Sequence, residues 1–542
     1  MKRLLPTLIL LLTGCPKKED DEEVDTSPAP ACDAVTFAAE GLDWSLPNFE
    51  GENWRDGVPF SEATGVSYRD CAAGEDLALH YHFADYTNDA VPDLVVTYDG
   101  CASSGLGRTH WDVYGGTASG FLSTAVAWSL PEFEGTGWSG DAPLSLTGGQ
   151  TYRSCGASSE SLLNFEVRDM NADAVPDLVI SLDQCAGSNV GSNVWEVYLG
   201  AGSGFAADPI QWSLPTLNGD AWTGVAVPFY GMEGATWRDC EGDHYADMYH
   251  TTADLSGDGI PDLVVTYDTC ANPDLSYLYW WVYPGGEDGF AADHEEFALP
   301  ARDGEDWFED GAITKLDGEG VRTCGAETGL SMVYTTTDMD GDGILDFTIV
   351  DDDCDTTGLG DTHWDVYLSD GQGFAEAATT WTLPAMEGED WNRGTPFAAV
   401  SDRDARTCGG VEDLVMRYQM ADLTGDGAQD MVVTVDECAD PDVGVKYWWV
   451  YPGTGAGFAT TALSWALPYP DGIGWSKDVP YPEMVESSYR DCGANDEADF
   501  NFSTFVISGD ANPDLVVTAD ACAGEAIGST AWKVYPGVCA DG

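Results

Sequence analysis

The chain repeats itself six times with an almost constant period. The phrase Pro-Asp-Leu-Val-Val and its variants recur 84 or 85 residues apart, with their aspartates at Asp93, Asp177, Asp262, Asp346, Asp430 and Asp514. Phrases that resemble Trp-Ser-Leu-Pro keep the same step and start at Trp44, Trp128, Trp212, Phe297, Trp381 and Trp465. Because equal units bury their apolar surface by stacking on one another, this feature limits the chain to a repeat architecture.

The residue pattern within each repeat predicts an all-β unit. In the first repeat the candidate strands lie near Phe37–Leu46, Ala78–Asp85, Asp93–Asp99 and Thr109–Gly115. They are rich in Val, Tyr, Trp and Thr and are bounded by Gly, Pro and Asn, which is typical of short strands joined by turns. A Trp-x-Val-Tyr phrase recurs with the same step, and we place it at Trp111, Trp195, Trp281, Trp364, Trp449 and Trp532. Four strands in each of six units indicate a six-bladed β-propeller, and an open β-solenoid is the alternative.

The two ends of the chain favour a closed ring. A Gly-Phe pair lies seven residues before the Trp of the next phrase, as at Phe121, Phe205 and Phe458, but the last repeat ends before reaching its own. Phe37 is a spare copy seven residues before Trp44, so the N-terminal strand is expected to complete the last blade and leave no exposed sheet edge. The repeats are then about 44–127, 128–211, 212–296, 297–380, 381–464, and 465–542 together with 32–43.

The fifteen cysteines follow the same repeat. Twelve form pairs 30 positions apart, at Cys71/Cys101, Cys155/Cys185, Cys240/Cys270, Cys324/Cys354, Cys408/Cys438 and Cys492/Cys522. Cys32 and Cys539 stand one at each end, at neighbouring positions of a shared blade, and we expect a disulfide between them that fastens the ring. Paired cysteines at fixed spacing predict disulfides in a secreted chain, whereas a zinc site would need clustered Cys or His ligands.

The first 31 residues predict export and attachment. Met1-Lys2-Arg3 precedes a nine-residue apolar run, Leu4–Leu12, which is too short to span a bilayer and is typical of a signal peptide over residues 1–14. The phrase Leu12-Thr13-Gly14-Cys15 resembles the lipobox of bacterial lipoproteins, which implies lipidation of Cys15; an ordinary secretory signal is the alternative. Residues 15–31 are charged and Pro-containing, as in a solvated tether. We expect a lipid-anchored protein of the bacterial cell envelope, at the outer membrane or the cell surface.

A nine-residue loop rich in carboxylates precedes each Leu-Val-Val strand. Its positions 1, 3, 5 and 9 offer side-chain oxygens and position 7 a backbone carbonyl, which suits the six to eight oxygen ligands of Ca²⁺. Position 6 is Gly in loops three to five, where a sharp turn is needed, and Ala in loops one and two. The candidate ligands are Asp85, Thr87, Asp89, Val91 and Asp93; Asp169, Asn171, Asp173, Val175 and Asp177; Asp254, Ser256, Asp258, Ile260 and Asp262; Asp338, Asp340, Asp342, Ile344 and Asp346; Asp422, Thr424, Asp426, Ala428 and Asp430; and Ser508, Asp510 and Asp514.

The alternative is that these loops are acidic turns that hold no ion. Loop six is the weakest match, because Val506 stands at its first position.

The loop pattern before a Leu-Val-Val strand, followed by Val-Tyr-x-Gly and Gly-Phe, resembles the FG-GAP (VCBS-like) repeats of integrin α-subunit propellers. This resemblance covers residues 32–542 and implies a calcium-binding propeller of cell surfaces, used in adhesion or glycan recognition. The chain departs from it in having Gly-Phe for Phe-Gly, Ser-Leu-Pro for Gly-Ala-Pro, and longer units that carry the Cys pair.

Two further series keep the repeat. An Arg lies two residues before the first Cys of each pair and an Asp two before the second, and we expect six bidentate ion pairs; six anion sites are the alternative. These residues are Arg69, Arg153, Arg238, Arg322, Arg406 and Arg490, with Asp99, Asp183, Asp268, Asp352, Asp436 and Asp520. A tryptophan series after Gly-rich turns is expected to pack internally, with stacking on sugar rings as the alternative, at Trp54, Trp138, Trp222, Trp307, Trp391 and Trp475.

Charge and composition limit the function. Asp and Glu number 95 against 21 Lys and Arg, a formal net charge of −74, which excludes a general nucleic-acid binder. The seven His share no repeat register except His110 and His363, and neither a nucleophile elbow nor a P-loop is present. We therefore expect a monomeric binding or adhesion module for an unknown glycan or protein. A propeller-based polysaccharide lyase or hydrolase and a structural envelope protein are the alternatives.

Overall fold

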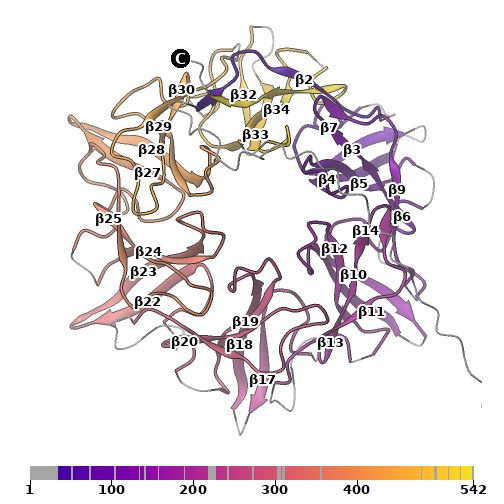
Figure 1. Cartoon of the computed structure of the whole chain (residues 1–542). Helices are drawn as coiled ribbons and strands as arrows, with labels where there is room; N and C mark the ends of the chain where they lie inside the picture. Colours follow the sequence, from indigo (N-terminus) through magenta and orange to yellow (C-terminus); the bar gives the residue numbers. More distant parts are fainter. Residues whose placement is uncertain are drawn as a thin grey trace, which may run out of the picture.

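The computed structural model consists of strands and turns. It describes residues 35–539 except for 50–52, 72–74, 103–104, 134, 139–141, 157, 188, 218–221, 223–226, 241–242, 272–273, 302–306, 308–311, 355–356, 471, 478, 494–496, 511 and 525. No α-helix occurs in these ranges, and so none that could cross a membrane. The predicted signal peptide, Cys15, the tether and Cys32 lie outside the described residues. Figure 1 shows the sheets following one another around a common centre in chain order.

Within the described residues, six mainly antiparallel sheets share one design, and a seventh, two-stranded sheet pairs β1 (Val35–Phe37) with β36 (Gly537–Cys539). We number the six sheets of this design one to six, and each contains five main strands in hydrogen-bonded order. Sheets one and two consist of β3 (Gly65–Cys71), β4 (Glu75–Ala84), β5 (Asp93–Asp99), β6 (His110–Tyr114) and β9 (Val126–Ser129), and of β10 (Gly148–Cys155), β11 (Ser158–Arg168), β12 (Asp177–Asp183), β13 (Val194–Tyr198) and β16 (Ile210–Ser213). Sheets three and four consist of β17 (Gly234–Cys240), β18 (Asp243–Ala253), β19 (Asp262–Asp268), β20 (Tyr279–Tyr283) and β21 (Glu295–Ala298), and of β22 (Gly318–Cys324), β23 (Glu327–Thr337), β24 (Asp346–Asp352), β25 (His363–Tyr367) and β26 (Thr379–Thr382). Sheets five and six consist of β27 (Asp402–Cys408), β28 (Val411–Ala421), β29 (Asp430–Asp436), β30 (Tyr447–Tyr451) and β31 (Leu463–Ala466), and of β32 (Val485–Arg490), β33 (Ala498–Phe505), β34 (Asp514–Asp520), β35 (Ala531–Tyr535) and β2 (Leu42–Ser45).

The prediction of four strands per unit is therefore wrong by one. The missed strand is the first of each sheet, β3 in the first repeat, and the predicted strand Phe37–Leu46 is two separate strands, β1 (Val35–Phe37) and β2. The first strand is an edge strand with few apolar residues, so its sequence lacks the burial pattern that identifies the others. The third strand is the opposite case: all seven residues of β19 are buried, as its Leu-Val-Val run predicts.

A pair of buried aromatic residues, two tryptophans in every sheet except the third, forms the core of each sheet and ties it to the next. Trp111 on the fourth strand lies opposite Trp128 on the fifth, and both are 0–1 % exposed. The Trp111 indole donates a 2.8 Å hydrogen bond to the carbonyl oxygen of Leu144, which leads into the second sheet. Our placement of this series at Trp281 and Trp449 is wrong, since the residues in the equivalent position are their buried neighbours Trp280 and Trp448, which make the same bond.

The N-terminal strands complete the sixth sheet. β2 pairs with β35, so that Trp44 lies opposite Trp532, and β1 pairs with β36 (Gly537–Cys539). In other repeats the chain itself supplies these short pairs, as in β7 (Gly116–Thr117) with β8 (Gly120–Phe121) and β14 (Gly200–Ala201) with β15 (Gly204–Phe205). The Trp532 indole donates to the Phe60 carbonyl, which joins the sixth sheet to the segment before the first. The predicted completion by the N-terminus is thus confirmed at the level of strand pairing, while the side chain of Cys539 lies outside those described.

Phe37 packs where the sequence predicts that the spare copy of the Gly-Phe residue lies. Its ring contacts Trp448 and Trp465 edge-on at centroid distances of 5.8 and 5.6 Å. Phe121, in the Gly-Phe pair of the first repeat, contacts Trp44 and Trp532 of the sixth sheet in the same way, with ring centroids 6.0 Å apart in each case. The phenylalanine of each Gly-Phe pair therefore packs against the paired aromatic residues of the preceding sheet, and the N-terminus supplies the copy that the C-terminus lacks.

Candidate functional site

The carboxylate loops connect the second and third strands of every sheet. Each starts at the end of a long strand such as β23 and ends at the aspartate that begins the next, Asp346 at the start of β24. The strand pairing therefore gives all six loops the same orientation in their sheets. The predicted ligand residues of each loop lie together in one turn, and the differences between loops are local.

The position-nine aspartate anchors each loop. All six are 0–1 % exposed, and one carboxylate oxygen accepts the backbone N–H of position two, as Asp346 does from Met339 at 3.0 Å. The other oxygen accepts a backbone N–H from 23 residues later, Ser369 in this loop, at 2.9 Å. Burial raises the pKa of these carboxyl groups, to about 7 for Asp177 and about 6 for Asp346 and Asp430. A second lone pair on each oxygen can still bind a cation.

The other carboxylates fold the loop around its own backbone. The position-one aspartate accepts the N–H of position six, as Asp338 does from Gly343 at 2.9 Å. The position-five aspartate accepts the N–H of position seven, as Asp342 does from Ile344 at 2.8 Å. The same two bonds recur in loops one, two, three and five. In loop six Val506 cannot make the first, and the bond from Asn512 to Asp510 is kept.

Loop four brings three carboxylates to one point. Oxygen atoms of Asp338, Asp340 and Asp346 all lie within 4.8 Å of one another. Two oxygens on opposite sides of a Ca²⁺ ion, each at about 2.4 Å, are about 4.8 Å apart, so these three oxygens can share one ion. In the other loops a hydroxyl or amide stands at position three. The donor set of hard oxygens thus fits Ca²⁺, and in loop four its spacing fits as well.

Neighbouring loops touch. The Asn88 side chain donates a 3.0 Å hydrogen bond to the Asp173 carbonyl, joining loops one and two. A methyl group built on Gly259 would lie 3.1 Å from Ala172, and one on Gly257 would lie 2.6 Å from Ile344, so loops two, three and four are also adjacent. Loops four and five meet at Gly341 and Gly427, and loops six and one at Gly509 and Val91. The loops therefore lie on one face of the molecule, where their carboxylates form a shared acidic surface.

Position six requires a left-handed backbone even where it is not glycine. Gly259, Gly343 and Gly427 have φ values of +85° to +92°, and Ala90 and Ala174 have +66° and +65°. A residue with a Cβ atom pays about 1–2 kcal/mol for this conformation. The prediction that glycine belongs here is confirmed, and loops one and two carry the strain that its absence causes.

Ala174→Gly is therefore expected to raise the free energy of unfolding by about 0.5–1 kcal/mol, since relief of strain exceeds the added entropy of the unfolded chain. The reciprocal variant Gly343→Ala is the control. No atom lies within 4 Å of a Cβ built on Gly343, so its cost, about 1 kcal/mol, is conformational only. Urea unfolding in calcium measures both changes. A less stable Ala174→Gly variant would contradict the assignment.

A second repeated cluster joins the disulfides to buried ion pairs. The structure shows disulfides Cys71–Cys101, Cys155–Cys185, Cys324–Cys354, Cys408–Cys438 and Cys492–Cys522, with Cα atoms 5.7–6.0 Å apart. Cys270 is also disulfide-bonded, and the side chain of its expected partner Cys240 is not among those described. Beside each pair the predicted Arg contacts the predicted Asp, as Arg69 does Asp99 at 2.6 Å, and the five other pairs are equivalent.

The ion pair of the fifth repeat is not bidentate, and a tryptophan covers its guanidinium. In the fifth repeat one guanidinium nitrogen of Arg406 contacts Asp436, and the other terminal nitrogen has no partner. The guanidinium lies 4.6 Å from the ring centre of Trp391, and the five other tryptophans of that series cover their arginines at 4.7–5.0 Å. One face of each tryptophan is therefore occupied by an arginine, which is a cation–π packing role. The expected packing role is observed on the arginine-facing side of each ring, while Trp307 is the one tryptophan of this series that is buried.

Asp436→Ala is expected to lower the free energy of unfolding by about 3–5 kcal/mol, because it leaves the fully buried Arg406 charge without a partner. Asp442→Ala is the matched control, since the Asp442–Lys446 pair is 41 % and 60 % exposed. Its loss should leave the free energy of unfolding almost unchanged, because water screens this exposed pair. Denaturant midpoints of the two variants compare them directly, and equal losses would show that the buried pair is not important for stability.

Sequence reasoning missed the grooves between sheets. Cavities of about 420 and 210 Å³ lie at equivalent places, one between the third and fourth sheets and one between the fifth and sixth. It also missed three exposed aromatic rings at one repeat position on the first strand, Tyr152, Trp237 and Tyr489, which are 45–52 % exposed. Both features depend on strand β3 and its equivalents, which the sequence pattern did not reveal.

Comparison with known proteins does not assign a family. No family model matches the chain, and no curated protein matches it. Among solved structures, an Agrocybe aegerita lectin described as recognising non-reducing terminal N-acetylglucosamine aligns with 93 % of this chain and 97 % of its own, at 12 % identity and a TM-score of 0.35. The V. cholerae biofilm matrix protein Bap1 aligns over 93 % and 88 %, at 10 % identity and a TM-score of 0.14. These values are too low for either match to indicate function.

Proposed function

We propose that this chain is a calcium-stabilised binding module of the cell envelope. The observation that carries the proposal is loop four, where carboxylate oxygens of Asp338, Asp340 and Asp346 lie within the diameter of one calcium coordination shell. Loops one, two, three and five share its hydrogen-bonded plan, and they extend the proposal to further sites. Asp338, Asp340, Asp342 and Asp346, with the Ile344 carbonyl, would hold the ion and neutralise a cluster that otherwise repels itself.

We propose further that the six sheets form a closed six-bladed β-propeller of the FG-GAP type. Three observations support this: the equal design of the sheets, the pairing of β2 with β35, and the hydrogen bond from Trp532 to Phe60 that links the last sheet to the first. The Cys32–Cys539 clasp belongs to the same proposal. An open solenoid would leave the edge of β35 that faces away from β34 without a partner strand.

The place of action and the ligand are also proposals. The disulfides support an extracytoplasmic location. Lipidation of Cys15 would hold the propeller at the outer membrane, with residues 16–31 as the tether. The uniform design of the loops supports recognition of a glycan or protein more than catalysis, because no single loop carries a distinct set of acid and base groups. A glycan array probed with and without calcium tests this part.

Calcium stoichiometry is expected to reveal several sites, and Asp342→Ala should remove about one of them. Asp342 is exposed at position five, so its loss removes a ligand without opening the core. Equilibrium dialysis with ⁴⁵Ca²⁺ at millimolar calcium measures the number of ions bound, in the dissociation range of about 10⁻⁴–10⁻³ M typical of extracellular modules. Glu376→Ala removes an exposed carboxylate outside the loops and is the control. Absence of bound calcium, or equal stoichiometry in both variants, would disprove the proposal.

A further inference from the structure

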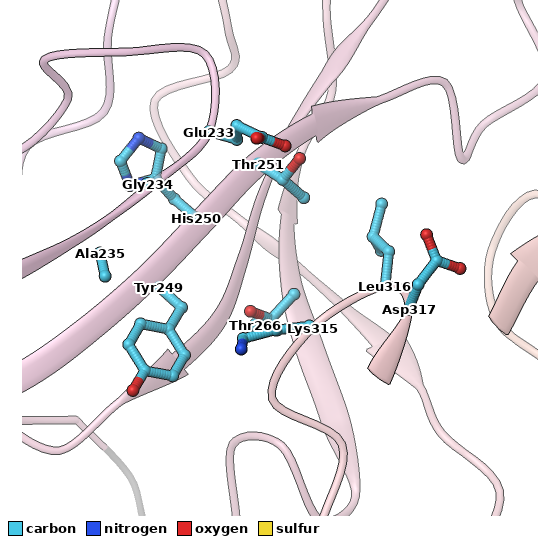
Figure 2. Close-up of a pocket in the computed structure, with 10 residues that line it drawn as sticks. All are labelled: Glu233, Gly234, Ala235, Tyr249, His250, Thr251, Thr266, Lys315, Leu316 and Asp317. Carbon is cyan, nitrogen blue, oxygen red and sulfur yellow. The ribbon is translucent and has the colours of Figure 1, made fainter. Parts of the chain in front are cut away.

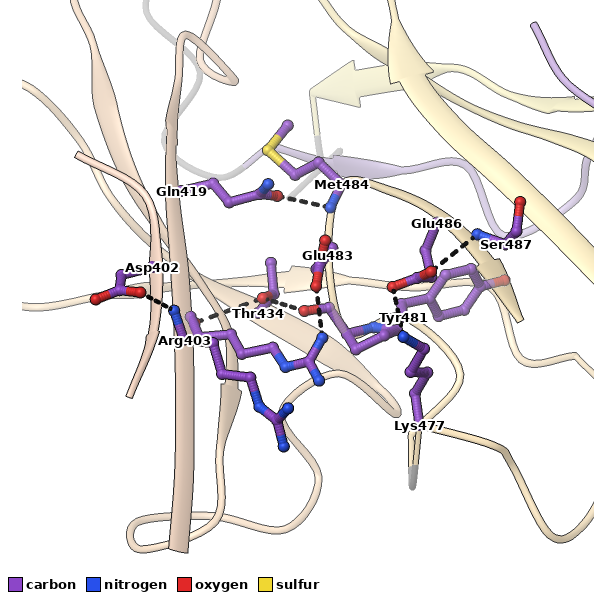
Figure 3. Close-up of polar contacts among 12 residues, drawn as sticks. Asp402, Arg403, Gln419, Thr434, Lys477, Tyr481, Glu483, Met484, Glu486 and Ser487 are labelled. Atoms are coloured by element: carbon purple, nitrogen blue, oxygen red, sulfur yellow. Dashed lines mark hydrogen bonds and ion pairs between the residues drawn. The ribbon is translucent and has the colours of Figure 1, made fainter. Parts of the chain in front are cut away.

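One inter-sheet groove differs chemically from the others. A cavity of about 210 Å³ between the fifth and sixth sheets is lined by Ser401, Asp402, Arg403, Arg417, Tyr418, Gln419 and Glu483. Arg403 is on β27, Arg417 and Gln419 are on β28, and Glu483 is on the segment that leads into β32. Figure 3 shows Arg403, Gln419 and Glu483 around this groove. It is distinct from the calcium loops, which lie between the second and third strands.

Two arginines stand directly opposite each other in this groove. Arg403 and Arg417 are register partners on adjacent antiparallel strands. The equivalent pairs in the other sheets are Val66 and His80, Gln150 and Asn164, Ala235 and Tyr249, Glu319 and Val333, and Ser487 and Asn501. Like charges in this position destabilise a sheet, so the fold gains nothing from this pair. The pair is the more unusual because the chain has only 21 Lys and Arg among 542 residues.

Two arginines and two carboxylates line the groove, and both carboxylates are already paired, one of them with an arginine outside the lining. Arg417 is 7 % exposed and pairs with Glu483 at 2.6 Å, which uses that carboxylate. Asp402 pairs with Arg393 at 3.2 Å. Within the described part of the chain, the guanidinium of Arg403 makes no ion pair and no hydrogen bond, and its side chain is exposed. One positive charge is thus left without a partner in a protein whose net charge is −74.

Two of the side chains that line the groove, Gln419 and Arg403, present donors to it. Gln419 uses its carbonyl oxygen to accept the Met484 N–H at 2.7 Å, and this fixes the amide so that its NH₂ group is free to donate. Arg403 offers a whole guanidinium, whose fork matches a carboxylate or phosphate in two parallel hydrogen bonds. Glu483 holds Arg417 in place from the facing sheet, so the second guanidinium is oriented before a ligand arrives.

We propose that this groove is a binding subsite for an oxyanion, such as the carboxylate of an acidic sugar or a phosphate group. Arg403 would bind the anion directly, Arg417 would add its charge from behind, and Gln419 would donate to a neighbouring oxygen. The cavity is of monosaccharide size, which favours a carboxylate carried on one sugar unit. The proposal rests on the binding-module part of the proposed function, and names its ligand chemistry, but does not depend on the calcium loops.

The equivalent groove between the third and fourth sheets provides a natural control. Its cavity, about 420 Å³, has Tyr249 and Lys315 where the first has Arg417 and Glu483 (Figure 2). The Lys315 ammonium lies 5.8 Å from the Tyr249 ring centre, and Asp317 accepts hydrogen bonds from Thr335 and Thr336. This groove is larger but has no arginine, so removal of its lysine changes the net charge without affecting the proposed subsite.

The test is calorimetric titration of the full chain with sodium glucuronate and with neutral glucose in excess calcium. The arm with inorganic phosphate is run in calcium-free buffer, because calcium phosphate precipitates. Wild-type protein should bind glucuronate at least tenfold more tightly than glucose. Arg403→Ser, which introduces the residue of the sixth sheet, should weaken glucuronate binding on the order of tenfold, the usual worth of a charge-assisted hydrogen bond. Lys315→Gln should bind as the wild type does. Because Arg403→Ser removes like-charge repulsion, its melting temperature should be unchanged or higher, so that unfolding cannot explain the loss.

Each outcome is decisive. Displacement of glucuronate by phosphate, lost in Arg403→Ser, would support the subsite and identify free oxyanions as its ligands. Equal binding of glucuronate by wild type and Arg403→Ser, or equal binding of glucuronate and glucose, would overturn it. The same titration with Asp342→Ala separates this proposal from the calcium proposal, because glucuronate held by calcium at the loops would lose about one site in that variant and none in Arg403→Ser.

Discussion

Deletion of residues 35–45 should prevent the chain from folding to a stable monomer. The deletion removes β1 and β2, and with them Phe37 and Trp44, which are 3 % and 1 % exposed. Loss of one large buried aromatic side chain costs about 3–5 kcal/mol. Two of them, together with the strand pairing to β35, approach or exceed the total stability of about 5–15 kcal/mol that is usual for a folded protein. Size-exclusion chromatography should show aggregates, because β35 becomes an exposed edge.

A second deletion near the N-terminus tests whether the loss of folding depends on which residues are removed or only on how many. Removal of residues 16–31, the proposed tether, should leave the elution volume and melting temperature unchanged. Phe37→Ala is the finer probe, since it keeps both strands and removes only the contact with Trp448 and Trp465. It should lose about 3–5 kcal/mol without aggregation at low temperature. A monomeric 35–45 deletion with an unchanged melting temperature would contradict the closed ring.

The repeat made the larger features predictable. A 30-residue Cys spacing, repeated in register, predicted which cysteines pair, and the Arg and Asp two residues before them followed from that pairing. The spare Phe37 predicted where the N-terminus packs, because a missing motif at one end and an extra one at the other point to a single site. These inferences rest on comparison between repeats, which needs no knowledge of local geometry.

What the sequence could not predict depends on side chains that meet across strands. The first strand of each sheet has a polar, edge-like composition, so β3 was missed, and with it the opposition of Arg403 and Arg417. The tryptophan series at Trp54 was correctly expected to pack, but its partner, Arg69, lies 15 residues away and is brought over the ring by a turn. The Trp280 register could have been read from the sequence, because in Trp-Trp-Val-Tyr only the first tryptophan matches Trp-x-Val-Tyr, and the pairing of Trp280 with Phe297 agrees with it.

Removal of calcium should cause a second large loss of stability, and the loss should be cooperative between loops. At millimolar calcium each filled site contributes about 1–2 kcal/mol by mass action, so three filled loops would contribute about 3–6 kcal/mol. Loops three to five should fill first, since they have glycine at position six, and loop six last, since Val506 offers no ligand. A chelator should therefore lower the melting temperature well beyond the effect of matched ionic strength.

The contacts between loops predict how that loss is distributed. Gly341 of loop four lies against Gly427 of loop five, and Ile344 of loop four lies against Gly257 of loop three, so an ion that orders one loop also restricts its neighbours. Asp342→Ala should then reduce the calcium-dependent rise in melting temperature by more than one site's share, whereas Asp89→Ala in the strained loop one should reduce it by less. Differential scanning calorimetry of both variants, with calcium and with chelator, measures the difference. Identical melting curves of the wild type in the two conditions would mean that the loops are acidic turns, whose backbone hydrogen bonds alone account for their shape.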